Sequence, residues 1–470
     1  MKSQKYQHPT SLYKDQESQK NKHRIDLLFI AGAALFFMIW AWQWNRFDLG
    51  LDGPDEWMRF DIIRYLTEHW DLPRGDNPAI INPIWGFSYA FHPYIPHIIS
   101  ALFIRAARFF TDDIHILVFT ARLASVMFGT GTVWMSIKIA RKILKDRADQ
   151  WIFLFFITFL PQMVYLNAYV NCESMAIFST AVLIYAWLLG MESRWDPKSC
   201  IILGTGLALC ALSYVTAYGF LVCSFLFFCL SILLCQDKKW EFKTLFQKGG
   251  IVLLVFVLLA GWWFIRNAVL YQGDFLGIRS RDLCGEIHAQ DLYKPSLHPT
   301  YEKDGLSFLQ GVRAMCSGLG WHRDTFKSFV GAFYDTSVRL PQLIYNLYKI
   351  LFAAGILGCL LSFRKLFSVR KDGGWREEGI FHWMLVLAVI IPNFLNLYAS
   401  YAVDYQPQGR YSMPMLLPFM YFITFGITQI MDRLVKCQKA RAIIKGALCF
   451  GLFSIAVYAL RYYSLWIQAQ

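Results

Sequence analysis

The sequence predicts an all-α polytopic membrane protein with about eleven transmembrane helices, interfacial helices in a first outer loop and one further long outer loop. Of the 470 residues, 56% are hydrophobic and only 17% are charged, a balance that a soluble core of this size could not bury. Apolar runs of roughly 20 residues, each long enough to cross the hydrocarbon layer as a helix, recur along nearly the whole chain. Lys and Arg gather in every second short connection, as expected for membrane orientation.

The predicted transmembrane helices follow one another closely, so they form one unit rather than separate modules. They begin near Leu27, His115, Trp151, Ser174, Ser199, Thr216, Gly249, Leu343, Gly379, Tyr411 and Ala442. Basic connections such as "KILKDRAD" are expected in the cytoplasm. An odd number of crossings then places the N-terminus in the cytoplasm and the C-terminus outside, in the cell (plasma or inner) membrane. Because topology accounts for the net charge of +13, no basic surface indicates nucleic-acid binding.

The chain divides into four predicted parts. Residues 1–26 form a basic cytoplasmic tail, and the apolar run after it lacks a cleavage pattern, so we expect a membrane anchor there. Residues 27–270 form a transmembrane core that includes a first long loop at 46–114. A second long loop follows at 271–341, and residues 342–470 form the C-terminal transmembrane helices.

Both long loops are predicted on the outer side. Cytoplasmic connections never exceed about fifteen residues, too few for a nucleotide-binding domain, so any chemistry is expected outside. In the first long loop, "HIISALFIRAARFF" is too short and too rich in Arg for a comfortable span, which indicates an interfacial helix. In the second, Cys284 and Cys316 could form a disulfide, although no metal-binding C-x-x-C spacing occurs in the chain.

An acidic pair stands out in "LDGPDEWMRFDIIRYL" of the first long loop. Asp55 and Glu56 follow Pro54, a residue suited to the first position of a helix, and carboxylates in a first turn favour the helix dipole by about 0.3–1 kcal/mol. That structural explanation competes with a catalytic one, because the pair lies close to a membrane helix, where carboxylates are unusual unless used. Successive helical residues point about 100° apart, so one carboxylate would react and the other orient or bind.

Four arginines are candidate phosphate ligands. Arg59 lies four residues after Asp55 on the same predicted helix, where an ion pair between the two is the structural alternative, and Arg64 follows one turn later. Arg410 heads a helix in "QPQGRYSMPMLLP", where snorkelling to the interface is the alternative. Arg122 lies inside a predicted span, so it should face a cavity or a carboxylate.

Polar residues near the outer ends of the spans are candidate sugar or acceptor contacts. Gln162, Asn171 and Glu173 occur in "FLPQMVYLNAYVNCESM", where hydrogen bonding between helices is the alternative explanation. His92 lies among aromatic residues and prolines, and two histidines without a third ligand are weak evidence for a metal. No metal site is therefore predicted, although a divalent cation is left open as a cofactor.

The chain resembles the GT-C glycosyltransferases, multi-spanning membrane enzymes that include protein O-mannosyltransferases and aminoarabinose transferases. The resemblance rests on "PDEWMRFDIIRYLTEHWDLP", "PYIPHIISALFIRAARFF", "TARLASVMFGTGTVWMSIKIARKIL", "LPQMVYLNAYVNCES" and "QGRYSMPMLLP", and covers most of the chain in order. It implies that Asp55 is catalytic, with Glu56 beside it. Many relatives have a His where this sequence has Arg59, which leaves the role of that position open.

The resemblance implies sugar transfer from a polyprenyl-phosphate donor to a glycan, lipid or protein acceptor on the outer face. Because a single base suffices for direct displacement, inversion at the anomeric carbon is expected. An O-antigen-type polymerase or ligase is one alternative, and would depend on Arg279, Arg313, His322 and Arg323. A lipid-linked-sugar flippase or other transporter is another. It would favour charges within helices and an inverted repeat, but no repeat is visible and Arg122 is a rare intramembrane charge.

Overall fold

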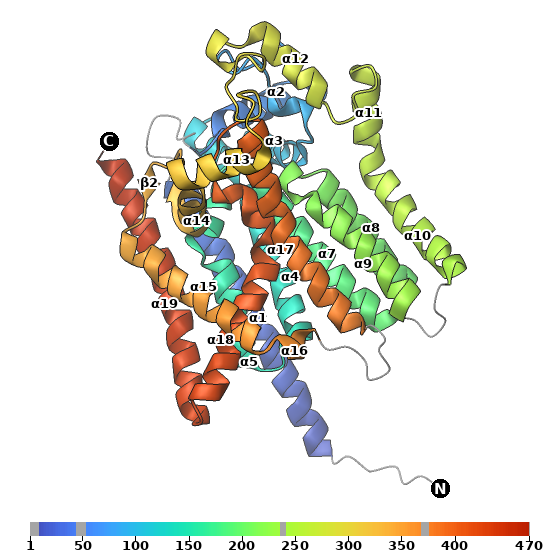
Figure 1. The fold of residues 1–470 in the computed structure, drawn as a ribbon, viewed down its shortest axis with the longest axis vertical. Helices are drawn as coiled ribbons and strands as arrows, with labels where there is room; N and C mark the ends of the chain where they lie inside the picture. The colour runs from blue at the N-terminus through green and yellow to red at the C-terminus, as the bar shows by residue number, and fades with distance from the viewer. Residues whose placement is uncertain (1–8, 44–52, 236–240, 368–375, 470) are drawn as a thin grey trace.

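The structure is a computed structural model that describes residues 9–43, 53–235, 241–367 and 376–469. In this part of the chain, nine helical stretches are long and apolar enough to cross a membrane (Figure 1). Six are single helices: α1 (Pro9–Gln43), α4 (Ile114–Ile143), α7 (Glu173–Ser193), α15 (Gln342–Leu361), α17 (Glu377–Ala402) and α19 (Gln438–Gln468). Three are composite: η3 (Val215–Ala217) with α9 (Gly219–Cys235); α10 (Phe242–Phe256) with η4 (Val257–Gly261) and α11 (Trp262–Leu270); and η7 (Gly409–Met415) with α18 (Leu416–Leu434).

Two predicted transmembrane helices differ from expectation. The one expected near Trp151 is broken into α5 (Arg147–Thr158) and α6 (Pro161–Leu166), because Pro161 cannot continue the preceding helix and Leu160 is extended. The one expected near Ser199 is α8 (Pro197–Ala211), with only 15 residues. At these two places the structure therefore has a broken helix and a short helix where one continuous apolar helix was expected.

The path of the chain nevertheless requires a return pass at both places. Glu56 binds both Arg122 near the start of α4 and the backbone of Val170 just before α7, so α4 and α7 begin at the same end of the bundle. The segment α5–α6 must bring the chain back between them. Likewise, Tyr214 follows α8 and lies against Arg59 at that same end, so α8 returns the chain after α7.

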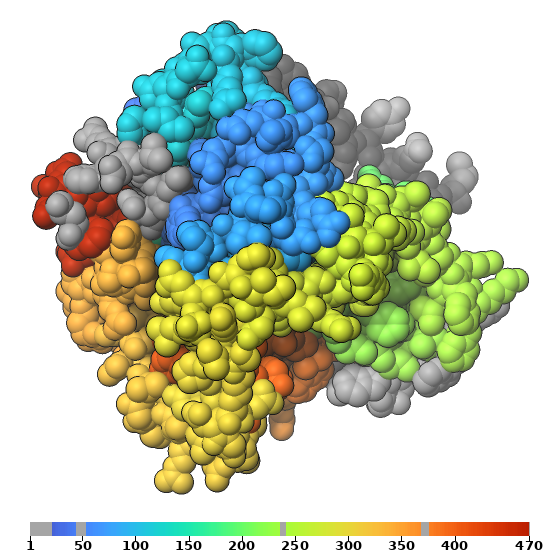
Figure 2. All heavy atoms as spheres, turned by 90° about the horizontal axis from the view of Figure 1, so that it is seen from above, coloured from blue at the N-terminus to red at the C-terminus, as the bar shows by residue number. Residues whose placement is uncertain are grey.

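The two long loops lie together at this end, called here the loop end (Figure 1). The first contains α2 (Glu56–Glu68), η2 (Tyr89–Phe91) and α3 (Ile95–Ala107). The second contains α12 (Ile278–His288), η5 (Asp291–Tyr293), α13 (Phe308–Arg313), η6 (Ala314–Leu319), α14 (Trp321–Gly331) and the strands β1 (Ala332–Phe333) and β2 (Val338–Arg339). It is therefore a folded element, and β1 and β2 pair antiparallel, with Ala332 opposite Arg339. Figure 2 shows the two loops side by side, and the Gln290 N–H donates to the Ile84 carbonyl at 3.1 Å.

The first long loop is anchored by α3, whose 13 residues are too few for a span. Its Arg105 donates to the carbonyls of Leu66 and His69, each at 2.6 Å, and so satisfies the C-terminal end of α2. The Ser100 hydroxyl donates to the Ala121 carbonyl of α4 at 2.7 Å. This arrangement explains an arginine in an apolar helix and fixes α2 against the spans.

Two hydrophobic clusters connect these elements. The larger one joins α1, α4, α5, α7, α9, α15, α17, α18 and α19, and the second joins α2 and α3 to α4 and α11. Where α15 meets α18, a Cβ on Gly358 would lie only 2.0 Å from the Gly426 carbonyl oxygen, so glycine permits backbone contact there. A short helix, α16 (Phe363–Leu366), follows α15 at the end of the bundle opposite the loop end (Figure 1).

Cys284 and Cys316, which the sequence left open as a possible pair, are both free thiols. Cys284 packs with Phe91 and Tyr271, whereas Cys316 packs near Trp321 in a different apolar cluster. Their separate packing explains why they do not pair.

Candidate active site

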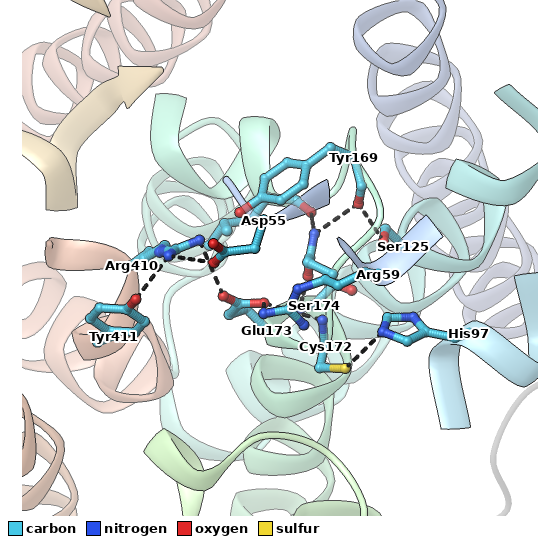
Figure 3. A network of polar contacts seen from close by, with 12 residues as sticks. Asp55, Arg59, His97, Ser125, Tyr169, Cys172, Glu173, Ser174, Arg410 and Tyr411 are labelled. Carbon is cyan, nitrogen blue, oxygen red and sulfur yellow. Dashed lines mark hydrogen bonds and ion pairs between the residues drawn. The ribbon is translucent and has the colours of Figure 1, made fainter. Parts of the chain in front are cut away.

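A group of charged side chains lies at the loop end, where three segments meet (Figure 3). Asp55 and Arg59 come from the start of α2, Glu173 from the first turn of α7, and Arg410 from η7. Arg59, Glu173 and Arg410 are buried. Burying a charge is costly unless other charges compensate it, so these residues depend on one another.

Asp55 is the most accessible member of this group, with its side chain 27% exposed. Its Oδ2 accepts a hydrogen bond from Arg410 Nη2 at 3.0 Å. Its backbone is left-handed, with φ of 59°, a conformation that Asp tolerates better than most residues and that often marks functional sites. Burial would raise the pKa of Asp55, but the charges of Arg410 and Arg59 outweigh it and place the pKa below 3.8.

Glu56 faces a different direction and is fully buried against Arg122. Its two carboxylate oxygens accept from Arg122 Nε and Nη2, both at 2.9 Å, and from the backbone N–H groups of Val170 at 2.8 Å and Gly53 at 3.2 Å. Arg122 Nη1 donates to the Ala41 carbonyl of α1 at 3.0 Å. Arg122 thus has the carboxylate partner expected of an intramembrane arginine. With its oxygens occupied in this way, Glu56 fits the orienting role rather than the reacting one, and Arg122 is bonded to Glu56 and the Ala41 carbonyl.

Arg59 forms its ion pair with Glu173, at 3.6 Å, and the predicted ion pair of Arg59 with Asp55 is not among the ion pairs of the described residues. The guanidinium group lies against the rings of Tyr89 and Tyr214, 4.6 and 5.5 Å from their centroids. Its Nε and Nη2 are buried without a hydrogen-bond partner among the described residues. The residue therefore retains unused donors.

Arg410 connects Asp55 to Glu173. Besides its bond to Asp55, Nη2 donates to the Tyr411 hydroxyl at 2.8 Å, and Nη1 lies 3.7 Å from Glu173 Oε1, longer than a hydrogen bond. Within the described residues, its buried Nε and Nη1 also lack hydrogen-bond partners. Arg59 and Arg410 thus share one buried carboxylate, Glu173, at distances longer than a hydrogen bond.

This arrangement has a definite chemical capacity. Arg59 and Arg410 carry two positive charges, and Asp55 and Glu173 carry two negative charges, so the group is close to neutral. Buried N–H donors without partners are unfavourable, and oxygens of a phosphate group would satisfy them. Asp55 has one carboxylate oxygen that is not bonded to Arg410, and its side chain is partly exposed.

Two further predicted site residues lie outside this group. Arg64 is exposed, with 56% of its side chain accessible, and pairs with Asp61 at 3.0 Å. His92 lies 3.5 Å from Arg281 of the second long loop. Burial, followed by the charge of Arg281, lowers the pKa of His92 to about 3, so its imidazole is neutral at pH 7.

Gln162 and Asn171 serve the packing of backbone segments. Gln162 Oε1 accepts from the Ala332 N–H at 3.0 Å and so joins α6 to β1. Asn171 donates to the Tyr169 carbonyl at 2.8 Å and accepts from the Ser174 N–H at 2.8 Å, which shapes the turn before α7. The contact of Gln162 therefore joins a helix to a strand, and those of Asn171 lie within one turn, rather than between two helices.

Several residues at the site were not predicted from the sequence. Tyr89, Tyr214 and Tyr411 surround the two guanidinium groups, with the rings of Tyr214 and Tyr411 stacked 6.4 Å apart. Below them, Cys172 Sγ lies 3.7 Å from His97 Nε2 (Figure 3). In a chain that is 17% aromatic, a tyrosine carries no distinctive signal, although Tyr411 directly follows Arg410 in the quoted motif.

Metal-binding side chains do not gather in threes among the residues that the structure describes. The carboxylates of Asp55 and Glu173 face guanidinium groups instead.

The fold and site define a polytopic membrane protein with a buried arginine–carboxylate group at one end of its helical bundle. Residues 77–419 match the family described as "Predicted membrane protein (DUF2142)", and the chain belongs to this family. No curated protein matches the sequence.

Solved structures give a likeness in fold. Oligosaccharyltransferase AglB from Archaeoglobus fulgidus, solved with an inhibitory peptide and a dolichol-phosphate, matches with a TM-score of 0.56 and 15% identity over 94% of this chain and 55% of AglB. AglB solved with Zn and sulfate matches with a TM-score of 0.53 and 14% identity, over 87% of this chain and 49% of AglB. ArnT from Cupriavidus metallidurans bound to undecaprenyl phosphate gives a TM-score of 0.39 and 13% identity, over 86% of this chain and 77% of ArnT. The chain thus spans about half the length of AglB and resembles its fold over that part.

Proposed function

We propose that the protein is a GT-C-type glycosyltransferase that moves a hexosyl or pentosyl unit from a polyprenyl-phosphate donor to a glycan, lipid or protein acceptor at the loop end. The observation that carries this proposal is the contact of Asp55 with Arg410 at 3.0 Å, beside spare N–H donors of Arg410 and Arg59. A general base and a phosphate-binding group are thereby adjacent. The fold shared with AglB, which was solved with a dolichol-phosphate, supports the same assignment.

In this mechanism Asp55 is the general base. It takes the proton of the acceptor hydroxyl while the hydroxyl oxygen forms a bond to the anomeric carbon of the donor sugar. The bond between that carbon and the phosphate oxygen breaks, and its electron pair leaves with the lipid phosphate. A single displacement from the face opposite the phosphate inverts the anomeric carbon.

Arg410 and Arg59 stabilise the charge that gathers on the departing phosphate, a contribution that often dominates catalysis. Glu173 lies between them and keeps the two guanidinium groups close together. Because the site without ligand is close to neutral, it suits a phosphodiester with one negative charge better than a diphosphate with two. The lipid tail remains in the bilayer.

We further propose that the loop end faces away from the cytoplasm, with the N-terminus inside and the C-terminus outside in the plasma or inner membrane. Charge supports this orientation: Lys142, Lys248, Lys365 and Arg433 lie near the ends of spans opposite the site. A nucleotide-linked sugar would then be on the wrong side, which favours a lipid-linked donor.

The alternatives place their chemistry elsewhere. Arg323, which a polymerase or ligase would use, is exposed and pairs with Asp324 at 3.4 Å, and Arg279 lines a separate surface cavity on α12. These contacts of Arg323 and Arg279 do not favour a polymerase or ligase over sugar transfer at Asp55.

Transfer itself is the direct test. The purified protein is reconstituted into liposomes with lipid-linked sugars extracted from cells that lack it, together with an envelope extract as acceptor. We expect a sugar to move from the lipid to the acceptor and polyprenyl phosphate to be released in equal amount, as measured by mass spectrometry. Intact donor lipid under conditions where the protein remains folded would reject the proposal.

The pH profile follows from the depressed pKa of Asp55. The reactive form is the carboxylate, and a lowered pKa keeps it ionised until the pH falls through the folded-state value, below 3.8. We expect kcat/KM to lose activity on the acid side only below about pH 4. The Arg410→Gln substitution removes the larger of the two lowering charges while burial still raises the pKa, so this acid limb should move to higher pH. Transfer rates between about pH 3 and about pH 8 test both statements, and an unmoved limb in the variant would contradict the assignment.

A further inference from the structure

Arg410 is the first member of a continuous hydrogen-bond chain that leaves the candidate active site. The Tyr411 hydroxyl accepts from Arg410 Nη2 at 2.8 Å and donates to Gln406 Oε1 at 2.5 Å. Gln406 Nε2 donates to Asp404 Oδ2 at 2.5 Å. Asp404 Oδ1 lies 3.1 Å from His298 Nε2, on the second long loop. Five side chains thus join the catalytic region to a loop that is more than a hundred residues away in sequence.

The donors and acceptors in this chain have one consistent direction. Arginine can only donate, so the Tyr411 oxygen accepts and its proton turns to Gln406. A carboxylate can only accept, so Asp404 requires the N–H side of the Gln406 amide and an N–H on His298 Nε2. Reversing the amide would place its oxygen against the carboxylate. Every polar group therefore has one favourable orientation, which gives the chain cooperative strength.

The chain also lies where it can determine the position of Arg410. The segment between α17 and η7, which carries Asp404 and Gln406, has no regular helix of its own. The Gln406 carbonyl accepts from the Ser400 hydroxyl at 3.2 Å, which ties this segment to α17. On the other side, the His298 N–H donates to the Lys294 carbonyl at 2.9 Å and so belongs to a turn of the second long loop. A shift of this turn would reach Arg410 through the side chains between them.

We infer that Tyr411, Gln406, Asp404 and His298 are positioning residues that hold Arg410 in its phosphate-binding place and couple it to the second long loop. This inference rests on the proposed function, because the role of Arg410 does. None of the four is required to touch the reacting atoms. Their effect passes through Arg410 alone, and that property distinguishes positioning from ordinary structural support.

A double-mutant cycle tests the inference. Gln406→Ala and Tyr411→Phe are each expected to lower kcat/KM about fivefold to tenfold, the loss typical of one hydrogen bond. If Gln406 acts through Tyr411, Gln406→Ala has little further effect in the Tyr411→Phe background. Tyr405→Phe is the matched control, since the ring of this neighbouring tyrosine contacts Tyr301 instead. Multiplying effects, about 25-fold or more in the double variant, would overturn the inference.

His298 supplies a second test at the accessible end of the chain, where folding is less at risk. His298→Gln keeps an N–H donor for Asp404 and should retain most activity, whereas His298→Leu should show the Gln406→Ala loss. Equal activity of the two variants would overturn the coupling to the second long loop.

The affinity for polyprenyl phosphate, measured with the same variants in nanodiscs, separates this inference from the proposed function. Wild-type protein that binds the lipid but transfers no sugar would reject the proposed transferase activity. The hydrogen-bond chain from Arg410 to His298 would then be tested by the double-mutant cycle in lipid affinity. For Gln406→Ala and Tyr411→Phe, the hydrogen-bond chain predicts the same non-additive loss in affinity for polyprenyl phosphate. Wild-type protein that binds no polyprenyl phosphate would reject both.

Discussion

Replacing Asp55 by Asn is expected to lower kcat for sugar transfer at least about 100-fold, the usual loss when a general base is removed. The amide has nearly the same shape as the carboxylate, and Asn also tolerates the left-handed backbone of this position. Folding should therefore be preserved, but the amide cannot take the acceptor proton. The measurement is the initial rate of transfer in proteoliposomes at saturating donor.

The same substitution has a second expected effect that a structural role would not produce. Removing the charge of Asp55 leaves Arg410 without its carboxylate partner at 3.0 Å, so the guanidinium group becomes more available to an anion. The affinity for polyprenyl phosphate should stay the same or increase while kcat falls. Asp61→Asn on the same helix is the control, because Asp61 only pairs with the exposed Arg64. A variant at Asp55 that retains near wild-type kcat would remove the general base from the mechanism.

The membrane architecture could be predicted because it depends on local composition. Apolar length indicated the nine helices of the described residues that are long enough to span a membrane, and α3, with 13 residues, is short as expected. The structure differs from expectation where one residue or a tertiary contact ends a helix. Pro161 divides the expected span near Trp151, and a turn leading to Tyr214 ends α8 early. Such breaks leave the average hydrophobicity of a segment almost unchanged.

The candidate site could be predicted only in part, for a related reason. Asp55 and Glu56 were noticeable because carboxylates are unusual beside a membrane, and Arg122 required a carboxylate for the same reason. Contacts between distant segments decide which carboxylate Arg122 binds. They also decide that Arg59 pairs with Glu173 and not with Asp55 on the same helix. Sequence spacing does not encode these contacts.

The buried pair of Glu56 and Arg122 leads to the largest expected effect on stability. Glu56→Met leaves the guanidinium group of Arg122 buried without its carboxylate partner, and losses of about 3–5 kcal/mol are typical when one member of such a pair is removed. Unfolding in detergent by a denaturant, followed by circular dichroism, measures this loss. Arg64→Ala, which breaks an exposed pair, should cost less than about 1 kcal/mol under the same conditions.

The double variant Glu56→Met with Arg122→Met separates the two contributions of the pair. Without any buried charge, the protein should recover more than half of the lost stability, because apolar side chains of similar volume often replace a buried ion pair well. Transfer should remain slow even so, since Glu56 also binds the backbone N–H groups of Gly53 and Val170, which fix Asp55 on one side and the approach to Glu173 on the other. Recovered stability with recovered activity would mean that the pair supports folding alone. Stability losses that simply add in the double variant would mean that the unpaired charge is not the cause of the instability.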